Sequence, residues 1–404
     1  MKILYVHQHF STPSGGVGTR SYEMAKAMTA AGHKVTIVCG SYANATTGLS
    51  QNFYWFTRRG NVDGIDVIEI DISCSNNQGL LIRAKAFLLF AFVSCFLALS
   101  LQYDLILATS TPLTTAFPGI LAKRFRRKRF IFEVRDLWPE LPKQMGVIKN
   151  PILLFLMRKL EKLAYQSADH CVGLAPGIVE SIAQDVTPAK VSLIPNGCDL
   201  DLFKQKQTGG DNGILPKLAT KFTAVFTGTH GRANGVRAIL DTASLLQDRT
   251  DISFLLIGDG ALKPLLVEEA RKMGLNNIYF ETPLPKRSLA ELLPTCSVGL
   301  QVLTNIPAFY YGTSPNKFFD YIASGLPVVT NYPGWIADLV RQHSCGLSVT
   351  PDNPQAFADA ITRLADDSET VKKMGVHSRK LAEANFDRSL QAQEMVRLIQ
   401  QVNC

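Results

Sequence analysis

The sequence predicts an α/β protein of two Rossmann-like domains, each with a doubly wound parallel sheet, facing a central cleft. Three observations support this. The chain has 404 residues, about twice the usual domain size. It is 46% hydrophobic and 19% charged, as folded globular proteins are. Short apolar runs recur with helix-length segments between them, which is typical of parallel sheets.

The first series of apolar runs predicts the strands of the first domain. The runs lie at residues 3–7, 35–39, 65–70, 104–108, 129–134, 170–174 and 191–195. Between the first two, residues 20–31 carry apolar side chains at helical spacing. Gly32 follows where helices commonly end, so we expect a helix there.

Residues 86–103 form a stretch of 18 residues without a charge, the lower limit for a membrane-spanning helix. The stretch lies between two expected strands. We therefore interpret it as a crossover helix whose surplus apolar face dips into a membrane interface. Burial in the core and a true transmembrane span are the alternatives.

The formal net charge is +8, and residues 1–200 hold 21 Lys and Arg against 14 Asp and Glu. Six of the seven residues at 123–129 are basic. Such a run predicts contact with a negatively charged partner, either nucleic acid or an anionic membrane surface, and a solvated helix end is the alternative. Its membrane-facing candidates are Arg124, Arg126, Arg127, Lys128 and Arg129.

Eight cysteines are scattered without any C-x-x-C pair, which favours buried free thiols. The opening residues lack a signal-peptide cleavage pattern. These features predict a reducing, cytoplasmic location. His7 and His9 have no third ligand nearby, so we expect no metal site at this pair. No cofactor is expected elsewhere in the chain.

Turn-forming residues replace the periodic pattern after residue 195, which predicts a linker at 196–220. We expect domains at 1–195 and 221–385, with a last helix at 386–404 that crosses back to the first domain. Residues 354–402 read as one or two helices. The second series of expected strands lies at 222–228, 252–258, 277–281, 298–303, 327–331 and 346–350.

Ligands of such folds bind beyond the carboxyl ends of the strands, where the candidate residues of the first domain lie. Gly15 and Gly16 precede a helix and could offer backbone amides to a phosphate, although the dinucleotide fingerprint fails at Ser21. Tight turns are the alternative. The other candidates, Thr109, Ser110, Arg135, Asp136 and Glu140, would bind a sugar acceptor or, in the case of Asp136, assist its deprotonation, with helix caps as the alternative.

In the second domain, residues 226–235 run from a strand end into a helix and carry Gly228 and Arg232, which suit a diphosphate. Gly258 follows the next strand and is a further donor-binding candidate, with a tight turn as the alternative. Residues 312–329 then place Asn316, Lys317 and Asp320 on the first turns of a helix, where a carboxylate could accept ribose hydroxyls. Helix caps and surface ion pairs are the alternatives.

Several motifs together resemble family 4 of the retaining glycosyltransferases, over essentially the whole chain. They are P-x-G-G at 13–16, A-G-H-K-V at 31–35, I-P-N-G at 194–197, I-G-D-G at 257–260 and P-N-K-F-F-D-Y at 315–321. R-D-L-W-P-E at 135–140 and A-T-S-T-P-L at 108–113 resemble a subgroup that contains bacterial O-antigen fucosaminyltransferases.

The resemblance implies the glycosyltransferase B architecture, with a nucleotide sugar on the second domain, the acceptor on the first and no metal requirement. Asp320 matches the second Glu of the family's E-x7-E pattern and implies ribose binding. The first Glu falls at Gly312, and the family's diphosphate-binding Lys is replaced by Asn234, with Arg232 as the nearest substitute.

The expected activity is retaining transfer of a sugar from a nucleotide donor to a polyprenyl-diphosphate-linked saccharide, with Asp136 and Arg232 as catalytic residues. A UDP-sugar is expected, N-acetylated deoxyhexosamines included. The expected setting is O-antigen or capsule synthesis at the inner face of the bacterial cytoplasmic membrane, with no nucleic-acid partner. An inactive membrane-surface binding protein and a nucleotide-sugar 2-epimerase of the same architecture are the alternatives.

Overall fold

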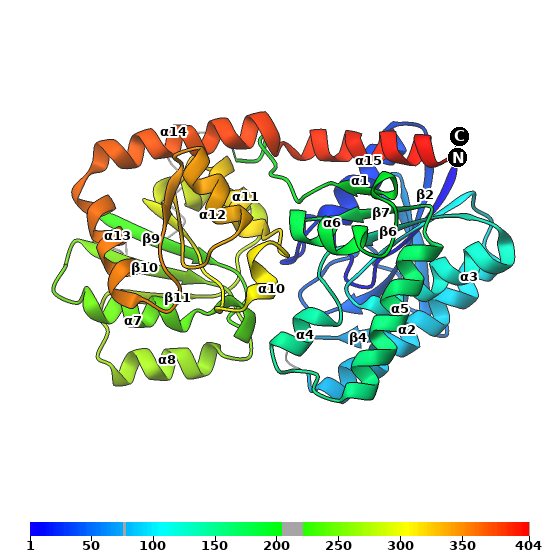
Figure 1. The fold of residues 1–404 in the computed structure, drawn as a ribbon, viewed down its shortest axis with the longest axis horizontal. Coiled ribbons are helices and arrows are strands. Elements are labelled where there is room, and N and C mark those ends of the chain that lie inside the picture. The colour runs from blue at the N-terminus through cyan, green and yellow to red at the C-terminus, as the bar shows by residue number, and fades with distance from the viewer. Residues whose placement is uncertain (76–77, 204–220, 404) are drawn as a thin grey trace. The chain divides into compact units, whose positions relative to one another are not determined.

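The structure, a computed structural model, describes residues 1–75, 78–203 and 221–403. The chain forms two compact units (Figure 1). One comprises Met1–Asn196, Tyr311–Ser314 and Ser389–Cys404, and the other Gly197–Tyr310 and Pro315–Arg388. Most of the expected linker at 196–220 lies outside the described residues.

The first unit contains a sheet whose strand order is β3-β4-β2-β1-β5-β6-β7-β8. Every expected strand of this domain is present. The strands are β1 (Lys2–Val6), β2 (Lys34–Tyr42), β3 (Thr57–Val62), β4 (Ile65–Cys74), β5 (Leu105–Thr109), β6 (Arg129–Val134), β7 (His170–Gly173) and β8 (Val191–Leu193). All neighbouring pairs are parallel except β3 with β4.

The antiparallel edge strand β3 departs from the fully parallel sheet that we expected. It forms a hairpin with β4 in which Val62 pairs with Ile65. The two loop residues, Asp63 and Gly64, have φ of 52° and 87°. An Asp-Gly loop with two positive φ angles matches the twist of antiparallel strands, so this dipeptide was an available hairpin signal.

Helices cover the sheet of the first unit. They are α1 (Arg20–Ala30), α2 (Leu80–Ser100), α3 (Ala116–Arg126), α4 (Glu140–Gln144), α5 (Pro151–Ser167), α6 (Pro176–Ala183) and α15 (Arg388–Asn403), with single 3₁₀ turns at Leu113–Thr115 and Pro188–Lys190. The end of α1 is as expected, because Gly32 follows it with φ 84°. The last helix, α15, adds Met395 and Ile399 to the core beneath β1 and β2.

Helix α2 connects β4 to β5, so the crossover interpretation is confirmed. Burial in the core is wrong, because only 22% of its most apolar 18-residue window is buried. Within the described residues α2 is also the one helix long and apolar enough to cross a membrane. Its exposed apolar residues are Leu80, Leu81, Ile82, Leu88, Leu89, Phe92, Phe96 and Leu99.

The second unit contains a parallel sheet with the strand order β11-β10-β9-β12-β13-β14. All expected strands are again present, as β9 (Phe222–Thr227), β10 (Ile252–Ile257), β11 (Ile278–Glu281), β12 (Val298–Gln301), β13 (Val328–Thr330) and β14 (Gly346–Ser348). Its core is built from the apolar side chains of these strands and of the helices around them.

The helices of this unit are α7 (Arg237–Leu245), α8 (Lys263–Lys272), α9 (Lys286–Leu292), α10 (Pro307–Tyr310), α11 (Asn316–Ala323), α12 (Trp335–Gln342), α13 (Pro354–Asp366) and α14 (Ser368–Asn385), with 3₁₀ turns η4 (Arg232–Asn234) and η5 (Leu293–Thr295). With α15, residues 354–402 form three helices, where we expected one or two. Asn353 caps α13 and Asp367 caps α14, and each cap begins a new helix.

Candidate functional site

The carboxyl ends of β1, β5 and β6 lie side by side at one edge of the first sheet. His7, Ser110 and Arg135 follow these strands directly. The Arg135 backbone N–H donates to Ser110 Oγ at 3.0 Å, and the Ser110 N–H donates to the Glu133 carbonyl at 2.9 Å. The structure therefore brings the predicted acceptor segments 109–111 and 135–136 together.

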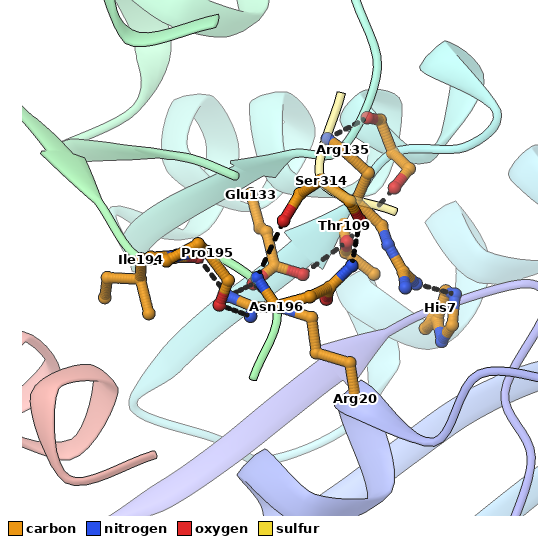
Figure 2. A network of polar contacts seen from close by, with 10 residues as sticks. His7, Arg20, Thr109, Glu133, Arg135, Ile194, Pro195, Asn196 and Ser314 are labelled. Atoms are coloured by element: carbon orange, nitrogen blue, oxygen red, sulfur yellow. Dashed lines mark hydrogen bonds and ion pairs between the residues drawn. The ribbon is translucent and has the colours of Figure 1, made fainter. Parts of the chain in front are cut away.

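A buried ion pair that the sequence analysis missed lies behind this edge (Figure 2). Arg20 donates from Nε and Nη2 to Glu133 Oε2 at 3.0 and 2.9 Å. Thr109 donates to the other carboxylate oxygen at 2.8 Å, so its hydroxyl is engaged within the protein and not presented to an acceptor. Burial raises the pKa of Glu133, but the charges of Arg20 and Arg135 outweigh it and the net pKa is lowered.

The same network holds the segment at which the chain leaves the first unit. Arg20 donates to the carbonyls of Ile194 and Pro195 at 2.8 and 2.5 Å. Asn196 bonds Ser314 twice, from its backbone N–H to Oγ at 3.0 Å and from Nδ2 to the carbonyl at 2.6 Å (Figure 2). A glutamate within residues 130–134, which are otherwise apolar, was the sequence signal for this network.

His7 orients the side chain of Arg135. Arg135 donates to His7 Nε2 at 2.9 Å (Figure 2). On the other side of the ring, His7 Nδ1 lies 2.7 Å from Ser21 Oγ. An imidazole that accepts at Nε2 carries its proton on Nδ1, so His7 is neutral and donates to Ser21. Burial and the nearby Arg135 charge hold the pKa of His7 well below its usual value. Among the described residues, Arg135 forms no ion pair.

Asp136 and Glu140 have different surroundings. Asp136 is half-buried and accepts from Thr111 Oγ1 at 2.7 Å, which places a carboxylate at the edge formed by β5 and β6. Glu140 begins α4 and bonds within it, to Lys143 at 3.4 Å and Gln144 at 2.8 Å. The structure does not bring Glu140 to the other acceptor candidates, because its own helix supplies nearer partners.

The backbone amides of Gly15 and Gly16 are not available to a phosphate, which corrects the predicted donor role. Gly15 N–H donates to the Thr12 carbonyl at 3.1 Å, and Gly16 N–H to the Asn44 carbonyl at 2.8 Å. A Cβ at Gly15 would lie 2.3 Å from Ser11 Oγ. These glycines form a tight turn, the alternative that the sequence left open.

The basic run at 123–129 is partly structural. Lys123 and Arg129 both pair with Asp169, at 2.5 and 3.5 Å. Arg126 donates to the carbonyls of Ala98 and Leu101 at the end of α2. Lys128 lies 5.7 Å from the Tyr103 ring, whereas Arg124 and Arg127 are exposed. Of the predicted membrane-facing set, Arg126 and Arg129 therefore have partners within the protein.

In the second unit, the loops after β9 and β10 approach each other through two glycines. Gly228 has φ 136° and Gly258 has φ 153°. A Cβ at Gly258 would lie 1.9 Å from the Gly228 carbonyl oxygen, and the Gly258 N–H already donates to the Glu281 carbonyl at 3.2 Å. Gly258 therefore packs closely against the Gly228 backbone, as the tight-turn alternative requires, and its own N–H is engaged within the protein.

Lys317 lies beside these loops, on the first turn of α11 after Asn316. Its Nζ donates to Asn234 Oδ1 at 2.7 Å and lies 4.3 Å from the centroid of the Phe226 ring. Burial lowers the pKa of this ammonium to about 7. Lys317 forms no ion pair with any residue that the structure describes.

His230 is fully buried, and the positive charge of Lys317 acts on its ring. Its ring stacks on Phe226 at 5.7 Å between centroids, and neither ring nitrogen has a partner within the described chain. Burial and the charge of Lys263 lower the pKa of His230 to about 4, and Lys317 adds to the effect. His230 is therefore a neutral imidazole near neutral pH.

Arg232 does not occupy the position that we expected. It lies on η4 with an exposed side chain, and its backbone carbonyl accepts from Thr304 Oγ1. The cation that meets Asn234 is Lys317. Asn234, which stands where the family has a Lys, thus lies next to Lys317 of α11. Sequence spacing could not reveal this contact.

Asp320 lies in a buried cluster of charged side chains. Its carboxylate is almost fully buried and pairs with Lys286 at 3.2 Å, and Lys286 contacts Asp199 at 2.9 Å. Asp199 pairs in turn with Arg388. Burial raises the pKa of Asp320, partly offset by Lys286. Asp320 thus belongs to a charge cluster with Lys286, Asp199 and Arg388, and its role in binding ribose stays a prediction. Within the described residues no three His, Cys, Asp or Glu form a group that could hold a metal.

Both halves of the chain match known protein families. Residues 15–197 match the glycosyl transferase 4-like domain, and residues 221–367 match glycosyl transferases group 1. Together these matches cover most of the 404 residues.

Similar characterised proteins act on sugars in bacteria. The D-rhamnosyltransferase WbpZ of Pseudomonas aeruginosa is 26% identical over 233 residues, which cover 57% of this chain and 58% of WbpZ. The O-antigen chain mannosyltransferase C of Escherichia coli is 24% identical over 254 residues, covering 59% of this chain and 62% of that protein. The chain thus matches less than two thirds of the length of either relative.

Solved structures share the fold over nearly the whole chain. Sucrose-phosphate synthase from Thermosynechococcus elongatus has a TM-score of 0.78 at 17% identity, covering 99% of this chain and 98% of that one. HepE from Anabaena, solved with UDP-glucose, has a TM-score of 0.72 at 18% identity, covering 99% and 100%. The fold is that of the glycosyltransferase B type, as predicted. The chain therefore belongs to the glycosyltransferases, with a glycosyl transferase 4-like domain in its N-terminal half and a group 1 glycosyl transferase domain in its C-terminal half.

Proposed function

We propose that this protein is a retaining glycosyltransferase that moves a sugar from a UDP-sugar to a polyprenyl-diphosphate-linked saccharide in bacterial surface-polysaccharide synthesis. N-acetylated deoxyhexosamines are among the donor sugars. The observation that carries the proposal is Lys317, a half-buried ammonium without a carboxylate partner among the described residues. The proposed mechanism needs no metal.

Even a partly buried ammonium without a counter-charge is costly, and a bound diphosphate would supply that charge. Lys317 lies on the first turn of α11, where the helix dipole also favours an anion. His230 adds buried ring nitrogens that could hydrogen-bond a phosphate or the base. Structures of HepE with UDP and with UDP-glucose support a uridine nucleotide as the donor's leaving group.

In the proposed reaction, the bond between the donor's anomeric carbon and the β-phosphate oxygen breaks. A bond from that carbon to the acceptor oxygen forms on the same face. The hydroxyl proton passes to the leaving diphosphate or to Asp136, whose carboxylate stands at the strand ends of the first unit. Lys317 stabilises the charge that develops on the diphosphate.

The acceptor class is proposed from the first unit. The exposed apolar residues of α2, together with exposed Arg124 and Arg127, suit a protein that works on a lipid-linked substrate at the inner face of the cytoplasmic membrane. The names of the O-antigen mannosyltransferase and of WaaG, a glycosyltransferase of lipopolysaccharide biosynthesis with a TM-score of 0.69 at 13% identity, support a bacterial surface glycan.

The test is a thermal-shift and calorimetric panel of UDP-sugars, GDP-mannose and free nucleoside diphosphates, each with and without EDTA. A ligand at one hundred times its Kd stabilises the protein by about 2.7 kcal/mol. We expect a shift with UDP-sugars that survives EDTA and is lost in Lys317→Ala. Lys272→Ala, on the exposed face of α8, is the matched control.

Other outcomes point to the alternatives. Vesicle binding without any nucleotide-induced shift would indicate an inactive membrane-surface protein. Interconversion of a UDP-sugar at C2 without an acceptor would indicate an epimerase. Selective stabilisation by GDP-mannose would indicate a GDP-sugar donor in place of the proposed UDP-sugar.

A further inference from the structure

Two arginines without acidic partners lie at the acceptor edge of the first unit. Arg135 follows β6 and is held by His7 at 2.9 Å. Arg83 lies on the first turn of α2, and its guanidinium carbon is 5.7 Å from the centroid of the Phe87 ring. Among the described residues, neither guanidinium forms an ion pair, and the buried Arg83 Nε has no hydrogen-bond partner.

Topology brings these two side chains to the same edge. Strand β4 runs parallel to β2, and β2 runs parallel to β1, so α2 begins at the edge where β1, β5 and β6 end. His9, just beyond β1, is close enough to both arginines for each charge to act on it. Its ring centroid is 6.3 Å from that of Phe87 and 6.4 Å from that of His7.

The electrostatics agree with this placement. Burial and the charges of Arg135 and Arg83 together lower the pKa of His9 to about 3. His9 is therefore neutral, and its buried Nε2 has no partner within the described residues. Helix α2 has no acidic residue in its first turn and starts after Gly79, which has no side chain to cap it. Every one of these features favours an anion here.

The same helix turn is apolar on its outer side. Leu80, Leu81 and Ile82 flank Arg83 and are 54%, 87% and 58% exposed. A site with two unpaired guanidiniums next to exposed aliphatic side chains fits a ligand that carries two negative charges on the end of a hydrocarbon chain.

We propose that Arg83 and Arg135 together bind the diphosphate of a polyprenyl-diphosphate-linked acceptor, whose lipid chain leaves along Leu80, Leu81 and Ile82. His7 positions Arg135, and His9 Nε2 hydrogen-bonds a phosphate oxygen. This inference rests on the proposed function, because it assigns the headgroup of the acceptor to side chains of this chain.

The experiment measures the affinity of the full-length protein for farnesyl diphosphate in detergent micelles, with farnesol as the uncharged comparison. We expect Arg83→Gln and Arg135→Gln each to weaken farnesyl diphosphate binding at least tenfold, without changing the affinity for UDP. Lys85→Gln is the matched control, since Lys85 is exposed on the same helix and its loss changes the net charge equally. Farnesol should bind weakly to every variant.

Equal affinities of Arg83→Gln and Lys85→Gln for farnesyl diphosphate would overturn the assignment. So would an equal loss of binding to phosphatidylglycerol vesicles in both variants with farnesyl diphosphate binding unchanged, which would mark Arg83 as a phospholipid contact. A failure of the proposed function would give a different result. UDP would then not bind the wild type, while Arg83→Gln would still weaken farnesyl diphosphate binding.

Discussion

Arg20 and Glu133 form a fully buried ion pair, with Arg20 Nη2 2.9 Å from Glu133 Oε2 and side-chain exposures of 1% and 0%. The pair joins α1 to β6. Arg20 also donates to the carbonyls of Ile194 and Pro195, and so holds the chain just before the segment Met1–Asn196 ends. It lies directly behind the edge that carries Ser110 and Arg135, so it supports the acceptor edge without itself being exposed.

Removing one partner of this pair should be strongly destabilising. Glu133→Ala leaves a buried guanidinium without its counter-charge, and we expect a loss of about 3–5 kcal/mol in urea unfolding of the first unit. The double variant Arg20→Met/Glu133→Met should lose less than the sum of the single changes. Arg59→Ala is the control, because the Arg59–Asp66 pair is exposed and should contribute less than about 1 kcal/mol. Similar losses in Glu133→Ala and Arg59→Ala would refute this ranking.

The Glu133 carboxylate should make the stability of the protein depend on pH in the acidic range. The folded pKa of Glu133 lies below its ordinary value of 4.5, mainly because Arg20 outweighs the effect of burial. Its stabilising contribution is therefore complete above pH 4.5 and is lost as the pH falls through the lower folded pKa. Acid unfolding followed by circular dichroism should be less steep in Glu133→Gln than in the wild type. An unchanged steepness would contradict this assignment.

Nucleotide affinity should depend on pH through Lys317. The free ammonium has a pKa of about 7 because of burial, and a bound diphosphate favours its charged form. Affinity for UDP should therefore rise as the pH falls from 9 to 7, by up to about tenfold per pH unit. Lys317→Arg keeps its charge throughout and should flatten this dependence, as calorimetry at each pH can show. A flat profile in the wild type would exclude Lys317 as the titrating group.

The close approach of Gly258 to Gly228 should tolerate no side chain. In Gly258→Ala the Cβ would lie 1.9 Å from the Gly228 carbonyl oxygen, so the two loops must separate. We expect a loss of about 3 kcal/mol in stability and weaker UDP binding. Gly231→Ala is the control, since its Cβ would meet only Thr229 Cγ2 at 3.4 Å. Equal Tm values for the two variants would contradict the packing argument.

Membrane association should depend on the exposed face of α2. Phe92 is 75% exposed, and Phe92→Glu should weaken binding to anionic vesicles by placing a charge where an aromatic ring would insert. Leu265→Glu, 55% exposed on α8 of the second unit, should leave vesicle binding unchanged. Sedimentation with phosphatidylglycerol vesicles compares them. Equal effects of the two changes would exclude α2 as the membrane-binding helix.

A second apolar surface was not anticipated from the sequence. Helix α3 packs against both α2 and α5 (Figure 1). On α5 the exposed apolar residues are Ile152, Leu153, Phe155, Leu156 and Leu163. Residues 152–157 form an unbroken apolar run of more than one helical turn, so a single packed face of α5 cannot bury all of these side chains.

The sequence by itself determined the two parallel sheets, because strand periodicity and turn residues are local properties of the chain. Thirteen expected strands are present, and the one that was missed, β3, carries a local Asp-Gly signal. The sequence also predicted that Ser110, Arg135 and Asp136 lie just beyond the carboxyl ends of strands, and because parallel strands end at one edge, these residues lie together there.

Only the tertiary structure decided which side chains at those edges are engaged. Thr109 and Asp320 are bound by buried charges, and the Gly15 and Gly16 amides by neighbouring carbonyls. Arg83 and Lys317, in contrast, have no acidic partner among the described residues. Such pairing joins groups as far apart in the chain as Arg20 and Glu133. It follows from the packing of whole elements, which no local pattern encodes.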